Sequence, residues 1–154
     1  MGDIFGEDFR DFLRALKSHK VDFVLIGDYA VIIRGYHRTT GDLDIFVRTS
    51  KANYHNLERA FTDFGMSTFN MTLESFLDSD NEVFTFGRSP VSIDILTSVK
   101  GLIFSEGKEY SSIVDVEGLI IPVLTKDGLI KAKKAADRPK DQQDIQELLS
   151  LEEE

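Results

Sequence analysis

The chain has 154 residues, of which 42% are hydrophobic, and a formal net charge of −9 at pH 7. This length predicts a single domain that buries roughly 70% of the surface exposed by the unfolded chain. No cysteine is present, so disulfides and thiolate metal sites are excluded. The negative charge argues against indiscriminate nucleic-acid binding, because that mode needs many Lys and Arg side chains to neutralise phosphates.

The N-terminal residues 1–8 are acidic and lack the apolar core of a signal peptide. No hydrophobic run approaches the length of a membrane span. We therefore expect a cytoplasmic protein without a membrane partner.

The first half of the chain predicts alternating helices and strands. Apolar residues at helical or strand spacing, together with glycines that end helices, define these elements. In chain order they are a helix over 7–19, a strand over 22–26, a short buried helix over 29–34, a strand over 43–47, a helix over 51–64 and a short helix over 72–77.

The second half predicts two hairpins followed by two helices. Strands over 82–86 and 91–96 flank a Gly- and Pro-containing turn at 87–90, and a second hairpin over 113–123 turns at Glu117-Gly118. Thr125 is a candidate N-cap for a lysine-rich helix, which Arg138-Pro139 separates from a last helix ending near Leu149. The order predicts an α+β fold, with a frayed tail at 152–154.

Three aspartates on predicted strands are candidates for a metal site. Asp42 and Asp44 lie two apart on one strand, so their carboxylates point to the same face while Leu43 points to the other. Asp94 stands among β-branched neighbours on another strand. Three carboxylates on adjoining strands could hold two Mg²⁺ ions, whereas an isolated Asp-x-Asp pair is commonly a solvated strand end.

A basic strip lies within this acidic chain, between residues 126 and 140. It contains the cations Lys126, Lys131, Lys133, Lys134, Arg138 and Lys140, against only two acids. It forms either a solvated helix face or part of a binding site. Its position relative to the aspartates decides between the two interpretations.

The spacing of these motifs resembles a known superfamily. Leu25-Ile26-Gly27-Asp28, thirteen further residues and Asp42-Leu43-Asp44-Ile45 resemble the signature of DNA polymerase β-type nucleotidyltransferases. The segment Arg38-Thr39-Thr40-Gly41-Asp42 and the tail from Leu129 to Asp144 resemble the bacterial branch that contains the AbiEii-type toxins. The resemblance extends from about Val21 to Leu149.

The resemblance implies a nucleotidyltransferase fold, with a mixed sheet flanked by helices, and transfer of a nucleoside monophosphate from an NTP to a hydroxyl. An RNA 3′ end or a protein side chain is the implied acceptor, in a toxin-antitoxin or phage-defence setting, and a cognate partner protein is implied as well. Two Mg²⁺ ions stabilise the charge that develops during such an in-line displacement.

The resemblance also assigns roles to individual residues. Asp42 and Asp44 would bridge the metals, and Asp94 would complete the catalytic metal and help to deprotonate the acceptor hydroxyl. The remaining candidates would surround the nucleotide: Gly27, Asp28 and Thr40 near its phosphates, and Lys133, Arg138 and Lys140 facing the triphosphate or an RNA backbone. Asp141 and Asp144 would orient these cations rather than bind metal.

One position departs from the superfamily pattern, because Asp28 stands where Gly or Ser is expected. We expect Gly27 to let phosphate approach the amides of the following helix, and Asp28 to cap those amides and compete with the phosphate. This predicts weak NTP affinity. The departure at Asp28 also favours two alternatives. In these the chain is either a nucleotide-binding or partner-binding protein without turnover, or a purely structural, antitoxin-like module.

Overall fold

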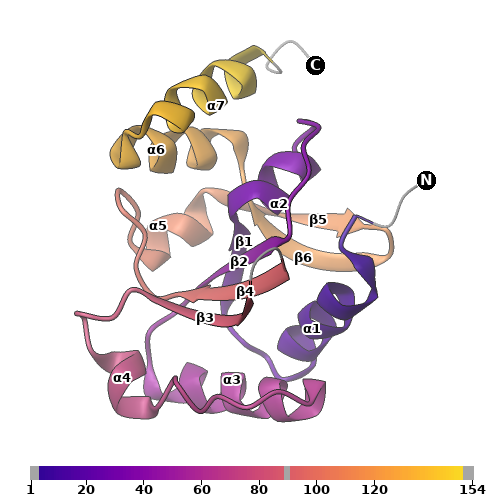
Figure 1. Cartoon of the computed structure of the whole chain (residues 1–154), viewed down its shortest axis with the longest axis vertical. Helices are drawn as coiled ribbons and strands as arrows, with labels where there is room; N and C mark the ends of the chain where they lie inside the picture. Colours follow the sequence, from indigo (N-terminus) through magenta and orange to yellow (C-terminus); the bar gives the residue numbers. More distant parts are fainter. Residues whose placement is uncertain (1–3, 89–90, 151–154) are drawn as a thin grey trace.

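The computed structural model describes residues 4–88 and 91–150, and this part of the chain forms one six-stranded sheet flanked by seven helices (Figure 1). The strands are β1 (Phe23–Ile26), β2 (Asp42–Val47), β3 (Val83–Arg88), β4 (Val91–Leu96), β5 (Ser111–Val116) and β6 (Leu119–Leu124). The helices are α1 (Gly6–Ser18), α2 (Gly27–Ile33), α3 (Lys51–Phe64), α4 (Leu73–Leu77), α5 (Phe104–Glu109), α6 (Lys126–Ala136) and α7 (Pro139–Ser150). No helix in the described ranges combines the length and apolarity needed to cross a membrane.

The sheet is mixed, with the strand order β3-β4-β2-β1-β6-β5. β2 pairs antiparallel with β1 and parallel with β4, while β1 also pairs parallel with β6. The hairpins β3-β4 and β5-β6 form the two sides of the sheet. This topology confirms the predicted α+β class with a mixed sheet.

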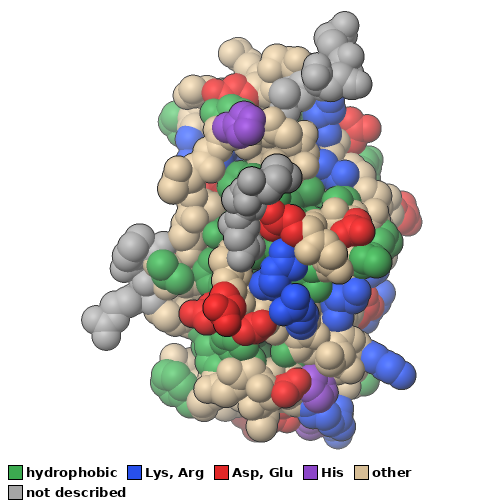
Figure 2. Space-filling model, turned by 90° about the vertical axis from the view of Figure 1, so that its right-hand side faces the viewer, with side chains coloured by type: hydrophobic (Ala, Val, Ile, Leu, Met, Phe, Trp, Pro, Cys, Tyr) green, Lys and Arg blue, Asp and Glu red, His purple; other side chains and the backbone are tan. Residues whose placement is uncertain are grey.

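The surface carries both signs of charge close together. Figure 2 shows Lys and Arg side chains lying among Asp and Glu side chains on one face of the molecule. Within the basic strip, Lys134, Arg138 and Lys140 are exposed whereas Lys133 is buried. The strip is therefore not a single solvated face, since one of its lysines points inward.

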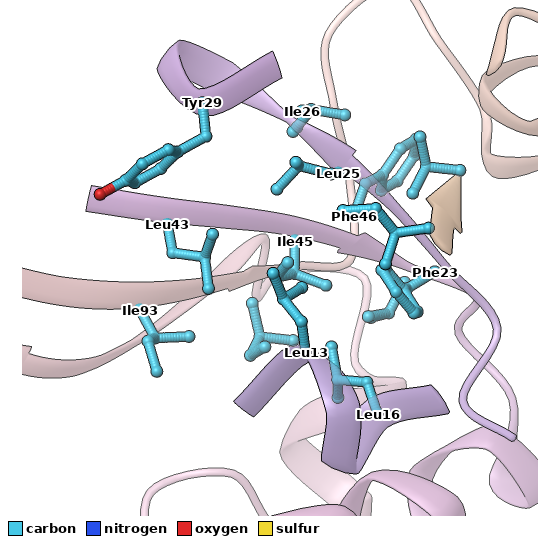
Figure 3. Close-up of a cluster of buried hydrophobic side chains, with 14 of the residues drawn as sticks. Leu13, Leu16, Phe23, Leu25, Ile26, Tyr29, Leu43, Ile45, Phe46 and Ile93 are labelled. Carbon is cyan, nitrogen blue, oxygen red and sulfur yellow. The ribbon is translucent and has the colours of Figure 1, made fainter. Parts of the chain in front are cut away.

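The apolar face of the sheet packs against α1, and the Phe61 ring of α3 packs against Phe86 of β3. Both helices lie below the sheet in Figure 1. Figure 3 shows Leu13 and Leu16 of α1 beneath Leu43 and Ile45 of β2. All four side chains are fully buried. Burying a side chain of this size contributes about 1.5–3 kcal/mol, so this face is the main support of the strands that carry the aspartates.

The predicted elements are present, with four main differences in bounds or number. The second helix begins at Gly27 itself rather than after it. Strands β5 and β6 extend beyond the predicted hairpin at both ends. Helix α5 has no counterpart among the predicted elements. Strand β3 continues through Gly87 and Arg88, which the sequence predicts as turn, because both pair with β4. Residues 89–90 of the predicted turn at 87–90, and the predicted frayed tail at 152–154, lie outside the described residues.

Candidate functional site

The register of β2 and β4 brings two of the three predicted aspartates together. These strands are parallel, and Asp44 pairs with Asp94 while Asp42 pairs with Ser92. Residues paired in this way point to the same face, and neighbouring strands lie about 4.8 Å apart. The alternate residues Leu43 and Ile45 enter the core on the other face. The strand pattern therefore holds the acids over a rigid apolar layer.

Gly27 lies directly against the carboxylate of Asp44. A Cβ atom built on Gly27 would stand 2.1 Å from Asp44 Oδ2, far inside van der Waals contact. Gly27 also has a φ angle of 74°, in the left-handed region that strains other residues. The β1-to-α2 turn thus needs glycine for two reasons, and the nearer one is the space taken by Asp44.

The Asp44 and Asp94 carboxyl groups repel each other. Burial, followed by the charge and hydrogen bonding of Asp94, raises the pKa of Asp44 to about 7. Asp94 Oδ1 is buried and has no hydrogen-bond partner. Buried polar atoms are normally paired, so this unpartnered acceptor next to a second carboxyl is suited to a cation.

A cleft of about 300 Å³ opens beside these acids. Its floor includes Gly27, Asp44 and Asp94, and the cations Lys133 of α6 and Arg138 of the α6–α7 connection lie on its wall. The complete lining consists of Ile26, Gly27, Asp44, Asp94, Leu96, Val99, Lys100, Leu124, Leu129, Ala132, Lys133, Ala136 and Arg138. An apolar pocket with a few convergent polar groups is typical of a small-molecule site.

Two cations of the cleft wall are held by acids of α7. Lys133 Nζ donates to Asp144 Oδ2 at 2.8 Å and lies 3.9 Å from Asp141 Oδ1. The guanidinium of Arg138 forms a bidentate pair with Asp141, with distances of 2.7 and 3.1 Å. Asp141 and Asp144 are both buried. The acids therefore contact Lys133 and Arg138 as the prediction of an orienting role requires.

Asp28 has a different role from the one predicted. The cap position of α2 is Ile26, whose apolar side chain forms no capping hydrogen bond, and Asp28 lies inside the first turn. Its carboxylate accepts a hydrogen bond from Arg38, which also donates to Asp144 Oδ1 at 2.6 Å. The predicted amide cap is therefore wrong, because the helix starts two residues earlier than predicted and Arg38 neutralises the carboxylate.

The remaining predicted site residues lie outside the cleft lining. Asp42 is exposed, and its Oδ1 accepts a hydrogen bond from Ser92 Oγ at 2.8 Å. Thr40 Oγ1 accepts from the Asp42 amide at 3.2 Å, and Lys140 is exposed on α7. Among the described residues, no three His, Asp or Glu side chains already form a group that could hold a metal ion. Asp44 and Asp94 lie next to each other, and the side chain of Asp42 would have to rotate away from Ser92 to join them.

Three contributors to this region had no assigned role in the sequence interpretation. Arg38 links α2 to α7 although it is separated by 106 residues from Asp144. Ser92 holds Asp42, and Lys100 lines the cleft from the loop after β4. The strand register across β2 and β4 could have indicated Ser92, since it precedes Asp94 by the same two residues that separate Asp42 from Asp44. No local pattern distinguishes Arg38 or Lys100 from other surface cations.

A larger groove of about 610 Å³ lies elsewhere on the molecule and is not the site predicted here. It is lined by polar residues at the end of α1 and on α3: His19, His55, Glu58, Arg59, Thr62 and Asp63. Two local pairs, His19 with Asp63 and His55 with Glu58, hold its titratable groups. It is a shallow surface groove without buried unpartnered groups.

Comparison of the sequence with models of protein families and with curated proteins finds no match. Two solved structures share its architecture. A protein of Thermotoga maritima, provisionally described as a nucleotidyltransferase, has a TM-score of 0.57 at 16% identity, over 92% of this chain and 90% of its own. An antigenic nucleotidyltransferase-like protein of Paracoccidioides brasiliensis has a TM-score of 0.52 at 11% identity, over 92% of this chain and 72% of its own.

The chain has the nucleotidyltransferase fold. At these identities the likeness concerns the fold, and it does not single out the AbiEii-type branch.

Proposed function

We propose that this chain is a Mg²⁺-dependent nucleotidyltransferase that moves a nucleoside monophosphate from an NTP to a hydroxyl group. The observation that carries the proposal is the pairing of Asp44 with Asp94 on the floor of a cleft whose wall presents Lys133 and Arg138. Carboxylates suited to a metal ion therefore lie opposite Lys and Arg side chains suited to phosphate oxygens. This is the charge arrangement that a metal-bound triphosphate requires.

The acids fit a divalent cation. Asp94 Oδ1 has no hydrogen-bond partner, and burial together with the neighbouring charge of Asp94 raises the pKa of Asp44. Asp44, Asp94 and a rotated Asp42 would hold the ion. When bound, the Mg²⁺ ion would neutralise charge on the phosphate oxygens.

The chain's own side chains supply the remaining functions. Lys133 and Arg138 would bind the oxygens of the β- and γ-phosphates, and the apolar wall from Val99, Leu124 and Leu129 would exclude water. The acceptor oxygen would form a bond to the α-phosphorus while the bond to pyrophosphate breaks. Asp94 Oδ1 is free to take the proton of that hydroxyl.

The acceptor would be an RNA 3′ end or a protein side chain, as the AbiEii-type resemblance implies. A toxin-antitoxin or phage-defence setting, with a cognate partner protein, is the biology that accompanies this resemblance. These assignments rest on the motifs from Arg38 to Asp44 and from Leu129 to Asp144.

A second candidate is a nucleotide-binding or partner-binding protein that does not turn over. The observation that favours it is the engagement of both cleft cations: Lys133 by Asp144 and Arg138 by Asp141. A triphosphate would have to share these cations with two buried carboxylates. The enzyme proposal is preferred because Asp44 and Asp94 remain paired at the cleft floor.

The test is transfer of label from each α-labelled NTP, with Mg²⁺, to total cellular RNA or protein, followed by gel separation. We expect label in one of these classes, and a loss in Asp44→Asn greater than the about 10- to 100-fold cost of removing an outer-shell metal partner. Asp80→Asn, which removes an exposed acid from a loop, is the matched control. Binding of Mg²⁺-NTP without label transfer would instead support the second candidate.

A further inference from the structure

Four charged side chains form a continuous line from α2 to the cleft. Arg38 donates to Asp28 through Nη1 and to Asp144 through Nη2, and Lys133 donates to the other oxygen of Asp144. The side chains of Arg38, Asp144 and Lys133 are 15%, 8% and 11% exposed. We call Asp28, Arg38, Asp144 and Lys133 the charge line.

Arg38 is held in a single orientation within the charge line. Its guanidinium lies 4.5 Å from the centre of the Tyr36 ring, and its two terminal nitrogens point to carboxylates of different helices. A planar guanidinium can satisfy both carboxylates at once, whereas the ammonium of a lysine is a point charge without this fork. Arg38 therefore connects α2 to α7 in a way that only arginine can.

Asp144 passes this constraint to Lys133. Its Oδ1 accepts from Arg38 at 2.6 Å and its Oδ2 accepts from Lys133 at 2.8 Å, so each carboxylate oxygen has one cation. Lys133 also lines the cleft with Asp44 and Asp94. The position of the lysine at the cleft thus depends on a carboxylate whose other oxygen Arg38 holds.

We propose that Asp28 and Arg38 are positioning residues that fix Lys133 for a triphosphate without contacting the nucleotide themselves. This inference rests on the proposed function, since it concerns the lysine of the same cleft. It assigns a use to Asp28, the residue that departs from the superfamily pattern. Asp28 is the second anchor of Arg38 rather than a competitor of phosphate.

The first experiment is a double-mutant cycle on nucleotide binding. Calorimetry would measure the affinity of Mg²⁺ with a non-hydrolysable α,β-methylene NTP for the wild type, Arg38→Gln, Lys133→Met and the double variant. Arg38 and Lys133 share the partner Asp144, and residues in one salt-bridge network couple. We therefore expect Arg38→Gln to weaken binding about tenfold in the wild type and less than about twofold in Lys133→Met. Arg14→Gln, which removes an exposed arginine paired with Asp11, is the control and should leave affinity unchanged.

Two results of this cycle would overturn the proposal. An equal loss in both backgrounds would show that Arg38 acts on the nucleotide independently of Lys133. No loss in either background would show that the charge line serves only to hold the helices together.

Asp28→Asn provides a milder variant, since this side chain is 30% exposed. We expect it to weaken binding, and tighter binding in Asp28→Asn or Asp28→Ser would restore the interpretation of Asp28 as a competitor of phosphate.

A second measurement separates failure of this proposal from failure of the proposed function. Denaturant unfolding of the same four chains gives the coupling between Arg38 and Lys133 through Asp144 in the absence of nucleotide. A non-additive effect of the two substitutions on unfolding is expected. Additive effects on unfolding would refute the coupling of Arg38 to Lys133, even if the wild type binds nucleotide. Non-additive effects in a chain that binds no nucleotide would refute the proposed function but leave this coupling in place. Arg38→Lys should not restore the coupling, because lysine cannot bridge both carboxylates.

Discussion

Gly27 and Asp44 act as one unit, although 17 positions separate them in the chain. The sequence motif explains the glycine by the approach of a phosphate, but in the structure the Asp44 carboxylate occupies the space that a side chain at this position would take. The turn from β1 into α2 therefore places the backbone of Gly27 against Asp44, a candidate metal ligand. Any side chain at residue 27 must displace Asp44 or the turn.

This arrangement predicts the effects of Gly27→Ala on stability and on metal binding. Left-handed backbone costs an alanine about 1–2 kcal/mol, and the contact of 2.1 Å with Asp44 Oδ2 adds to that cost. We expect a loss of more than about 2 kcal/mol in unfolding free energy, together with loss of Mg²⁺ binding. Denaturant unfolding and titration with Mg²⁺ would measure the two effects.

Gly118→Ala is the matched control for this prediction. Gly118 also has a positive φ, of 90°, but a Cβ there would meet nothing within 4 Å. It should lose only the backbone cost of about 1–2 kcal/mol and bind Mg²⁺ as the wild type does. Equal losses in both variants would show that the contact with Asp44 is unimportant.

Two carboxylates, Asp141 and Asp144, hold the C-terminal helices together and do so in their ionised form. Hydrogen bonding to Arg138 lowers the pKa of Asp141. Burial alone would raise the pKa of Asp144, but its hydrogen bonds to Arg38 and Lys133 outweigh burial and lower it. A carboxyl whose pKa is lower in the folded chain stabilises the fold above its unfolded pKa, which is 3.8 here. That stabilisation is lost as the pH falls through the lower, folded pKa.

We therefore predict an acid-labile α6–α7 pair. The unfolding free energy of the wild type should fall as the pH drops below about 4, and Asp141→Asn should flatten this dependence while costing about 2 kcal/mol at pH 7. Denaturant unfolding between pH 2 and pH 7 would measure the change. Asp80→Asn removes an exposed acid and should leave the pH slope intact. An unchanged slope in Asp141→Asn would contradict the assignment.

Most elements could be predicted from the sequence because each carries a local signal. The helix Lys51–Phe64 has a clear apolar stripe and a glycine end, and Thr125 caps α6 as expected, with its Oγ1 accepting from the Gly128 amide. Helix α5 (Phe104–Glu109) was missed because it has six residues, includes a glycine and has no apolar stripe. Tertiary packing explains that glycine, since a Cβ on Gly107 would come within 3.1 Å of the Phe46 ring.

The candidate site could be predicted only in part, for a similar reason. Alternation along one strand predicts that Asp42 and Asp44 share a face. The position of Asp94 on that face depends on the parallel register of β2 and β4. The side-chain directions within the site depend on contacts between distant segments. Ser92 draws Asp42 away from the pair, and Arg38 neutralises Asp28, and neither contact has a signal within its own element.

At the scale of the whole molecule, the cleft is assembled from three separated parts of the chain. Strands β1, β2 and β4 supply its floor, the loop after β4 supplies one wall, and α6 with Arg138 of the α6–α7 connection supplies the other. Gly101 permits this closure, because a Cβ there would stand 2.4 Å from the Ala135 side chain. The cations thus reach the acids only when α6 and α7 lie over the sheet, at the top of Figure 1.

The overall charge predicts how the chain would bind an RNA acceptor. The net charge is −9, and the face in Figure 2 has cations interleaved with acids, so few phosphates could be neutralised at once. For single strands the slope of log affinity against log salt is about −0.7 per phosphate contact, so two or three contacts predict a slope no steeper than about −2.

Fluorescence anisotropy with a short single-stranded RNA at 50 to 200 mM salt would measure this slope, and we expect about a 16-fold loss of affinity at most over that fourfold range. Lys133→Met should make the slope shallower by less than about one unit, since one cation contacts about one phosphate. Lys134→Met, on the exposed side of α6, is the matched control for the same loss of charge. A slope near −4 would require a basic track that the arrangement of Lys133 and Arg138 does not provide, and the acceptor would then bind elsewhere on the molecule.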